Sequence, residues 1–235
     1  SEIIIESQAI GPYMFYDCES LRTVTIPDSV TSIGEYAFAM SRNITTINNY
    51  SGIWSNYMFK GCDIALYSVT VLENDKEVGQ GVFEGCSVLQ EINFYGEHIG
   101  VEMFKNCISL QNINYVSKDD EDGKANLVTI GKSAFEGCIV LSGNDILPNE
   151  AFLTTIGETA FKGCVKLSTI LVPTTVTSIG RNVFYGCSGL NTLTVPFIGK
   201  DSPSNPDKSN TSTVEYFTDD SYTLGYLFGY GWAIA

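Results

Sequence analysis

Histidine, paired carboxylates and nucleotide-binding motifs are scarce or absent in this sequence. Histidine occurs once, at His98, and no partner pattern around it supports acid–base chemistry. There is no phosphate-binding glycine loop, no metal-ligand motif and no carboxylate pair at a recognisable spacing. We therefore expect no catalytic residue, no metal site and no cofactor.

Basic residues and long apolar runs are also scarce. The chain has 13 Lys and Arg against 27 Asp and Glu, a net charge of −14. Nucleic acids and anionic membranes bind basic patches, so neither is an expected partner. No apolar stretch approaches the roughly 20 residues of a membrane helix. The sequence opens on Ser1 part-way into a repeat, so we expect a mature or trimmed chain without its signal peptide.

What the sequence does contain is a repeat, best seen at residues 156–173, which read IGETAFKGCVKLSTILVP. Its steps, counted between phenylalanines, range from 21 residues (Phe38 to Phe59) to 31 (Phe104 to Phe135). A fixed apolar pattern with such a period is typical of a solenoid. The eight copies place their phenylalanine at Phe15, Phe38, Phe59, Phe83, Phe104, Phe135, Phe161 and Phe184.

Each repeat has two halves. The first ends in an alternating, β-branched stretch such as Val24-Thr25-Ile26, which predicts a short strand. The second holds Gly34 and then Ala37 and Phe38, which we interpret as one helical turn. Because such a unit cannot bury its apolar side alone, the copies should stack. The prediction is an α/β-type solenoid, with a parallel sheet on one face and short helical turns or irregular segments on the other.

The cysteines share a single repeat position in seven of the eight copies, and Ser41 occupies that position in the second copy. Equivalent side chains on stacked strands point in parallel about 4.8 Å apart, whereas a disulfide needs Cβ atoms near 3.8 Å with converging vectors. We therefore expect buried, reduced thiols rather than disulfides, with zinc binding as the less favoured alternative. The seven are Cys18, Cys62, Cys86, Cys107, Cys138, Cys164 and Cys187.

Two further columns flank the phenylalanines. Two residues after Phe, glycine predominates, which predicts a left-handed backbone at Gly61, Gly85, Gly137, Gly163 and Gly186. One residue after Phe, the charge alternates over five repeats, which predicts an exposed ladder of ion pairs along the stack. That ladder consists of Lys60, Glu84, Lys105, Glu136 and Lys162.

The pattern resembles the BspA-like leucine-rich repeat family. The matching segments are residues 33–38, 130–138, 156–173 and 179–196. The third repeat departs from it with Trp54-Ser55, and the fourth with Gln80-Gly81, at the Ile-Gly positions. The resemblance implies a leucine-rich repeat stack in a secreted or surface protein of a host-associated microbe, with a role in adhesion or protein binding.

The solenoid should span residues 1–196 with about eight repeats. Residues 197–235 form a loop and an aromatic capping segment of the same domain, where Phe228 is predicted to continue the phenylalanine column. Tyr13, Tyr36 and Tyr57 stand in one column two residues before Phe, either as a stripe for a partner or as packing over the convex side. Trp54 near them is predicted to lie in the core.

Two insertions lengthen the repeats, at residues 116–127 and 144–153, and should emerge at one edge of the stack. The first holds four acidic residues. An EF-hand would need ligands at Lys118 and Thr129, so we interpret this segment as a solvated loop, with weak calcium binding or partner contacts as alternatives. The acidic residues are Asp119, Asp120, Glu121 and Asp122.

The strand positions between the buried residues should face outward. This Thr/Asn surface can hydrogen-bond a protein or a glycan, although it also suits a merely soluble sheet. The leading hypothesis is a non-enzymatic extracellular binding or adhesion module for a matrix or surface protein, against a structural spacer and a glycan-binding module. The expected ligand-facing residues are Thr23, Thr25, Thr46, Asn48, Glu91, Asn93, Asn112, Asn114, Thr169, Thr192 and Thr194.

Overall fold

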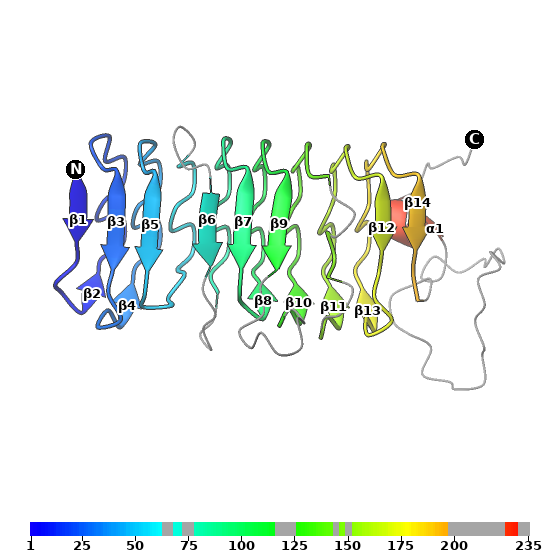
Figure 1. The fold of residues 1–235 in the computed structure, drawn as a ribbon, viewed down its shortest axis with the longest axis horizontal. Coiled ribbons are helices and arrows are strands. Elements are labelled where there is room, and N and C mark those ends of the chain that lie inside the picture. The colour runs from blue at the N-terminus through cyan, green and yellow to red at the C-terminus, as the bar shows by residue number, and fades with distance from the viewer. Residues whose placement is uncertain are drawn as a thin grey trace.

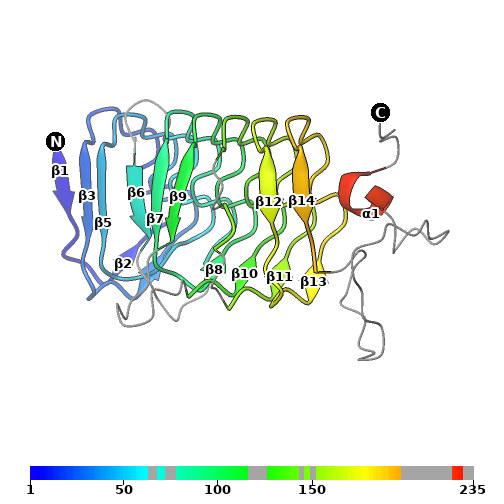
Figure 2. The same cartoon turned by 45° about the vertical axis from the view of Figure 1, so that its right-hand side comes forward.

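The computed structural model describes residues 1–62, 68–71, 78–115, 126–142, 146–148, 152–196 and 224–229. They form a stack of coils that runs from one end of the molecule to the other (Figures 1 and 2). We number the coils by their phenylalanine, from coil 1 with Phe15 to coil 8 with Phe184. Three columns follow the stack: a long strand, a short strand and a turn.

The long strands lie side by side and are all parallel. Their residues alternate as predicted: Val24 and Ile26 are buried while Thr23 and Thr25 face outward. They pair in three sections, β1-β3-β5, β6-β7-β9 and β12-β14. The strands are β1 (Glu2–Ile4), β3 (Thr23–Ile26), β5 (Thr46–Asn49), β6 (Ser68–Val71), β7 (Glu91–Phe94), β9 (Asn112–Tyr115), β12 (Thr169–Leu171) and β14 (Thr192–Thr194).

A second column of two-residue strands, which the sequence did not predict, precedes the turns of six coils, and an isolated bridge between Trp54 and Val78 takes its place in coils 3 and 4. It pairs as β2-β4 and as β8-β10-β11-β13, again in parallel. Each strand ends on an isoleucine of the Ile-Gly pair, so the column adds a row of inward apolar side chains. The strands are β2 (Ala9–Ile10), β4 (Ser32–Ile33), β8 (His98–Ile99), β10 (Thr129–Ile130), β11 (Thr155–Ile156) and β13 (Ser178–Ile179).

The prediction of helical turns opposite the sheet was wrong. These segments are hydrogen-bonded turns. The one helix in the described residues is α1 (Leu224–Phe228). The N–H groups of Tyr36, Phe38 and Met40 donate to carbonyls of the next coil, at 3.0, 2.9 and 2.7 Å. A helix would need those donors within its own coil. The fold is therefore a parallel β-solenoid with almost no helix.

Positive φ angles shape every turn at two positions. The five glycines two residues after Phe have φ from 69° to 78°, so that prediction is confirmed. The residue two before Phe also has a positive φ in all eight coils, which the sequence did not reveal because only Gly81 is a glycine there. The other seven are Tyr13, Tyr36, Tyr57, Glu102, Ser133, Thr159 and Asn182.

The phenylalanines form one stacked interior column, with ring centroids 5.1 to 6.0 Å apart from Phe15 to Phe184. Phe228 of α1 continues it at 6.1 Å from Phe184, as expected. The turn ladder continues as well, because Asn182 and Phe184 donate to the carbonyls of Tyr226 and Leu227. The helix thus covers the C-terminal side of coil 8 (Figure 2).

The cysteine column is reduced, as predicted, and buried in six of its seven members. Each buried thiol donates to the phenylalanine carbonyl of the preceding coil; Cys138 Sγ, for example, lies 3.1 Å from the Phe104 oxygen. Ser41 makes the same bond to Phe15 at 2.7 Å. The position therefore requires a small side chain with a donor. Burial raises the pKa of the Cys187 thiol to about 12 and that of Cys107 well above its usual range.

Candidate binding surfaces

The predicted strand-face residues lie on the outer side of the long strands and pair across them in register. Thr23 lies opposite Thr46, and Thr169 opposite Thr192. The face is not one continuous sheet, because the described strands pair in three sections. The first section holds Thr25 and Asn48, the second Glu91, Asn93, Asn112 and Asn114, and the third Thr194. Sequence periodicity found the side of each strand but not these interruptions.

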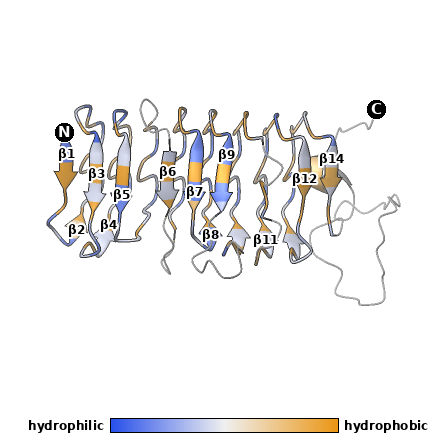
Figure 3. Ribbon diagram, viewed as in Figure 1, coloured by the Kyte–Doolittle hydropathy of each residue, from blue (hydrophilic) through white to orange (hydrophobic). Residues whose placement is uncertain are grey.

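The second section has the densest polar contacts. The Asn114 amide nitrogen donates to Glu91 Oε1 at 2.6 Å and to Asn93 Oδ1 at 2.9 Å. These bonds fix three side chains on neighbouring strands before any partner arrives. Figure 3 shows hydrophilic residues of β7 and β9 alternating with hydrophobic ones. In the first section the corresponding bond, from Asn48 to Thr25, is longer at 3.4 Å.

The predicted acidic loop contacts, Asp119, Asp120, Glu121 and Asp122, lie outside the described residues. The second insertion is described only in part. Ile146 and Leu147 are buried, and the Tyr115 hydroxyl donates to the Ile146 carbonyl at 2.9 Å. This segment therefore fills the core beside β9, in the coil between β9 and β12.

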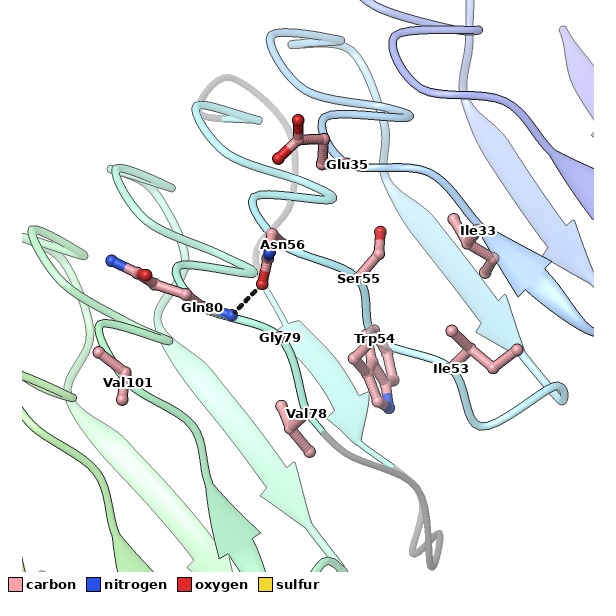
Figure 4. A pocket seen from close by; sticks show the side chains of 10 residues that line it. All are labelled: Ile33, Glu35, Ile53, Trp54, Ser55, Asn56, Val78, Gly79, Gln80 and Val101. Carbon is pink, nitrogen blue, oxygen red and sulfur yellow. Dashed lines mark hydrogen bonds between the residues drawn. The ribbon is translucent and has the colours of Figure 1, made fainter.

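A groove of about 660 Å³ opens on the turn side of coils 2 to 5 (Figure 4). Its apolar lining comes from the short-strand column and its polar lining from the residues that enter the turns. This site was missed from the sequence. It is lined by Ile33, Glu35, Ile53, Trp54, Ser55, Asn56, Val78, Gly79, Gln80 and Val101.

Coil length explains where the groove lies. From long strand to Ile-Gly pair, the chain runs from Ile26 to Ile33 in coil 2, but only from Asn49 to Trp54 in coil 3 and from Phe94 to Ile99 in coil 5. With two residues fewer, coils 3 and 5 do not pair their short strands with the coil before them. The two 21-residue steps were the sequence signal for this irregularity.

The pairing also corrects the repeat register. Trp54 pairs with Val78, so Val78-Gly79, and not Gln80-Gly81, occupies the Ile-Gly position of the fourth repeat. Trp54 is 1% exposed and packs against Phe59 and Phe83, as predicted. Its indole Nε1 makes no hydrogen bond with any described residue. A buried unpaired donor is costly, which marks coil 3 as a departure from the regular repeat.

The polar groups of the groove are partly fixed by the protein itself. The Gln80 amide nitrogen donates to Glu102 Oε2 at 2.6 Å, and the Gln80 backbone N–H donates to Asn56 Oδ1 at 2.8 Å (Figure 4). Ser55 donates to the Gly34 carbonyl at 2.9 Å. The Gln80 side-chain oxygen and the exposed Glu35 carboxylate thus remain as acceptors. Among the described residues, no basic side chain lines the groove.

A tyrosine column borders the groove, because Tyr36 and Tyr57 directly follow Glu35 and Asn56. The rings of Tyr13, Tyr36 and Tyr57 stack at 5.0 and 4.8 Å, and Lys60 Nζ lies 4.9 Å from the Tyr57 centroid. All three tyrosines have φ near 55°. Because the same position has a positive φ in all eight coils, this backbone conformation belongs to the repeated turn and does not by itself mark the groove.

The predicted charge ladder is present in part: in the described residues no ion pair joins Glu84 to Lys105, which pairs instead with Glu102 of its own coil at 2.9 Å. Lys60 pairs with Glu84 at 2.8 Å, and Glu136 lies between Lys105 at 3.7 Å and Lys162 at 2.8 Å. These side chains are partly exposed, so each pair contributes at most about 1 kcal/mol.

The residues three before Phe form another column. Their charges pair in the C-terminal half of the molecule, but among the described residues the charge in coil 2 does not. In coils 6 and 7, Lys132 and Glu158 pair at 2.9 Å. In coil 2, Glu35 lies between Pro12 and Asn56 of the adjacent coils and pairs with no basic side chain of the described chain.

Within the described ranges, no three His, Cys, Asp or Glu side chains are arranged to hold a metal ion. Across the same ranges, no helix is both long and apolar enough to cross a membrane.

The family model of the BspA-type leucine-rich repeat region matches residues 8–121 and 122–202, in six copies. The chain belongs to this family. BspA-type leucine-rich repeat proteins are typically surface proteins involved in binding. The model counts six copies where the structure stacks eight phenylalanine turns. No curated protein matches the chain.

Two solved structures of leucine-rich repeat proteins are similar to this chain, and the first of them shares its fold. A protein from Bacteroides ovatus ATCC 8483 is 26% identical over 80% of this chain and 46% of its own, with a TM-score of 0.63. A leucine-rich cell surface protein from Faecalibacterium prausnitzii A2-165 is 23% identical over 81% and 58%, with a TM-score of 0.45. The BspA-type chain described here thus spans about half the length of each of these two proteins.

Proposed function

We propose that this chain is a non-enzymatic binding module of a secreted or cell-surface protein, and that its strand face contacts a partner protein. The observation that carries the proposal is the fixed polar cluster of Glu91, Asn93 and Asn114 on β7 and β9. Family membership supports it, because BspA-type proteins are typically surface proteins involved in binding.

The geometry suits recognition of a folded surface or an extended chain. Polar side chains that are already ordered lose little conformational entropy when a partner binds. The outward positions of the long strands offer hydroxyl, amide and carboxylate groups on a nearly flat support. An adhesion role, with an extracellular-matrix protein as the partner, is the specific form of the proposal.

The test is a solid-phase screen of the purified chain against extracellular-matrix proteins and a glycan array. The test variant is Asn93→Ala/Asn114→Ala/Thr169→Ala, which changes the strand face alone. The matched control is Thr174→Ala/Thr175→Ala, at two exposed positions between β12 and β13. We expect a protein ligand that the control retains and the test variant loses.

Two results would overturn the proposal. Glycans bound in place of proteins would assign the face to a glycan-binding module. Absence of any ligand, or a ligand that binds both variants equally, would favour a rigid spacer that holds another domain away from a surface.

A further inference from the structure

We infer that the groove of coils 2 to 5 binds a cationic side chain with an aliphatic stem, a lysine or arginine of a partner polypeptide. The inference concerns the turn side of the stack and does not depend on the strand face. It begins from the residues three before Phe, where charges pair in the C-terminal coils and do not pair in coil 2.

Charge complementarity identifies the head of the ligand. Glu35 is an exposed carboxylate that pairs with no basic side chain of the described residues, in a column where Lys132 and Glu158 pair at 2.9 Å. Two coils further along the groove, the Gln80 side-chain oxygen accepts no hydrogen bond from a described residue, and its amide nitrogen is held by Glu102 at 2.6 Å. The described lining holds these two acceptors and no basic side chain, so it offers a cation charge-assisted hydrogen bonds.

The apolar lining identifies the stem. Ile33, Ile53, Val78 and Val101 line the groove beside these acceptors, and Val101 is 40% exposed. Lysine and arginine bury their methylene groups along apolar surface while the charged head stays in a polar environment. A volume of about 660 Å³ lies within the range of ligand pockets and accommodates such a side chain with part of its backbone.

The tyrosine column adds a third reason. The faces of aromatic rings attract cations, and the protein's own Lys60 already lies over the Tyr57 ring at 4.9 Å. Positive φ at Tyr36 and Tyr57 costs backbone energy that the turn ladder has to offset. The tyrosine column, the shortened coils and Glu35, which has no basic partner among the described residues, therefore meet at one place.

The experiment is an NMR titration of the ¹⁵N-labelled chain with acetylated pentapeptides. One carries a central lysine, a second a central arginine, and a third norleucine, which keeps the stem and lacks the charge. We expect the lysine or arginine peptide to shift the amide signals of Ser55, Gly79, Gln80 and Val101. The norleucine peptide should leave them unchanged.

Two variants make the test specific. Glu35→Gln should weaken binding by about three- to fivefold, the value of a partly exposed ion pair. Glu158→Gln changes the same column where the charge is already paired, and should bind as the wild type does. Val101→Lys, which places a cation in the groove, should abolish binding.

The inference is overturned if neither cationic peptide shifts the groove signals, or if norleucine shifts them equally. It is also overturned if Glu35→Gln and Glu158→Gln reduce binding to the same extent. The Asn93→Ala/Asn114→Ala/Thr169→Ala variant should bind the peptides normally, so a failure here leaves the proposal for the strand face standing.

Discussion

Coils 6 to 8 and coils 2 to 5 build the same turns but differ in what surrounds them. In coils 6 to 8 the short strands β10, β11 and β13 pair without a break, glycine closes each turn, and Lys132 pairs with Glu158. In coils 2 to 5 the short-strand column is interrupted twice, and Glu35 has no basic partner in the described part of the chain. The phenylalanine column and turn ladder run through both regions. The hydrogen bonds between turns and the phenylalanine column thus stabilise the whole stack. Coil length differs only outside these two features, and it differs in the coils that form the groove.

The largest effect should come from breaking the shared column within the regular region. Phe135 is fully buried between Phe104 and Phe161. Phe135→Ala should cost about 3–5 kcal/mol in the free energy of unfolding and split unfolding into two transitions, because each coil contacts only its neighbours. Urea denaturation measures this. Phe15→Ala, at the half-buried N-terminal position, is the control and should cost less; equal losses would contradict the account.

The next effect concerns the buried thiols of the cysteine column. Burial raises the pKa of Cys107, Cys138, Cys164 and Cys187 above the usual 9.0, so the folded protein keeps protons that the unfolded chain releases. Their stabilisation is therefore complete below about pH 9 and is lost as the pH rises, by up to about 1.4 kcal/mol per thiol and pH unit. Urea unfolding in reductant at pH 8, 9 and 10 tests this.

Cys138→Ser is the informative variant for that slope. Ser41 already makes the bond to a phenylalanine carbonyl, so the hydroxyl should be accommodated. The variant removes one titrating thiol, and stability should fall less steeply above pH 9 than in the wild type. Identical slopes would mean that Cys138 ionises equally in the folded and unfolded states.

The smallest expected effect is on the pH dependence of stability, in which a paired carboxylate should differ from an unpaired one. Burial opposes ionisation of Glu136, but hydrogen bonds from Lys162 and Ser133 hold its pKa below the usual 4.5. Its contribution is therefore present above about pH 4.5 and is lost as the pH falls through the lowered pKa. Glu136→Gln should cost about 1 kcal/mol or less at pH 7 and flatten the acid limb of stability.

The unpaired Glu35 supplies the control for that prediction. Glu35→Gln should leave the free energy of unfolding and its acid limb nearly unchanged, because no basic side chain of the described chain pairs with Glu35. Thermal unfolding at pH 7 and pH 4 compares the two variants. A loss at Glu35 as large as at Glu136 would show that Glu35 is paired in solution.

Much of the fold was predictable because single residues fix it. Phe, Cys and Gly recur at constant spacing, and each has one physical role: stacking, donation to a carbonyl or a left-handed backbone. The prediction of a helical turn at Ala37 and Phe38 was wrong. The spacing of residues within one repeat does not show that alternate N–H groups bond to the next coil. The short strands were missed because two residues carry too little periodicity to be recognised.

The candidate surfaces were less predictable. Alternation located Glu91, Asn93 and Asn114 on one face, but the hydrogen bonds that join them depend on register between strands. The groove depends on the pairing of Trp54 with Val78, and the apparent register placed Gln80-Gly81 there instead. Only the short steps between phenylalanines pointed to it.

Hydrogen–deuterium exchange of individual amides tests the central claim most directly, that the turn column is continuous while the short-strand column is not. The N–H groups of Phe38, Phe83 and Phe135 bond to the next coil in both regions and should exchange slowly throughout. Gly131, Gly157 and Gly180 should also be protected, because they donate to isoleucine carbonyls at 2.7 to 2.8 Å. Ser55 and Gly100, which lack that bond, should exchange faster than these three glycines. Equal protection of all five, or fast exchange at Phe38 and Phe83, would contradict the account.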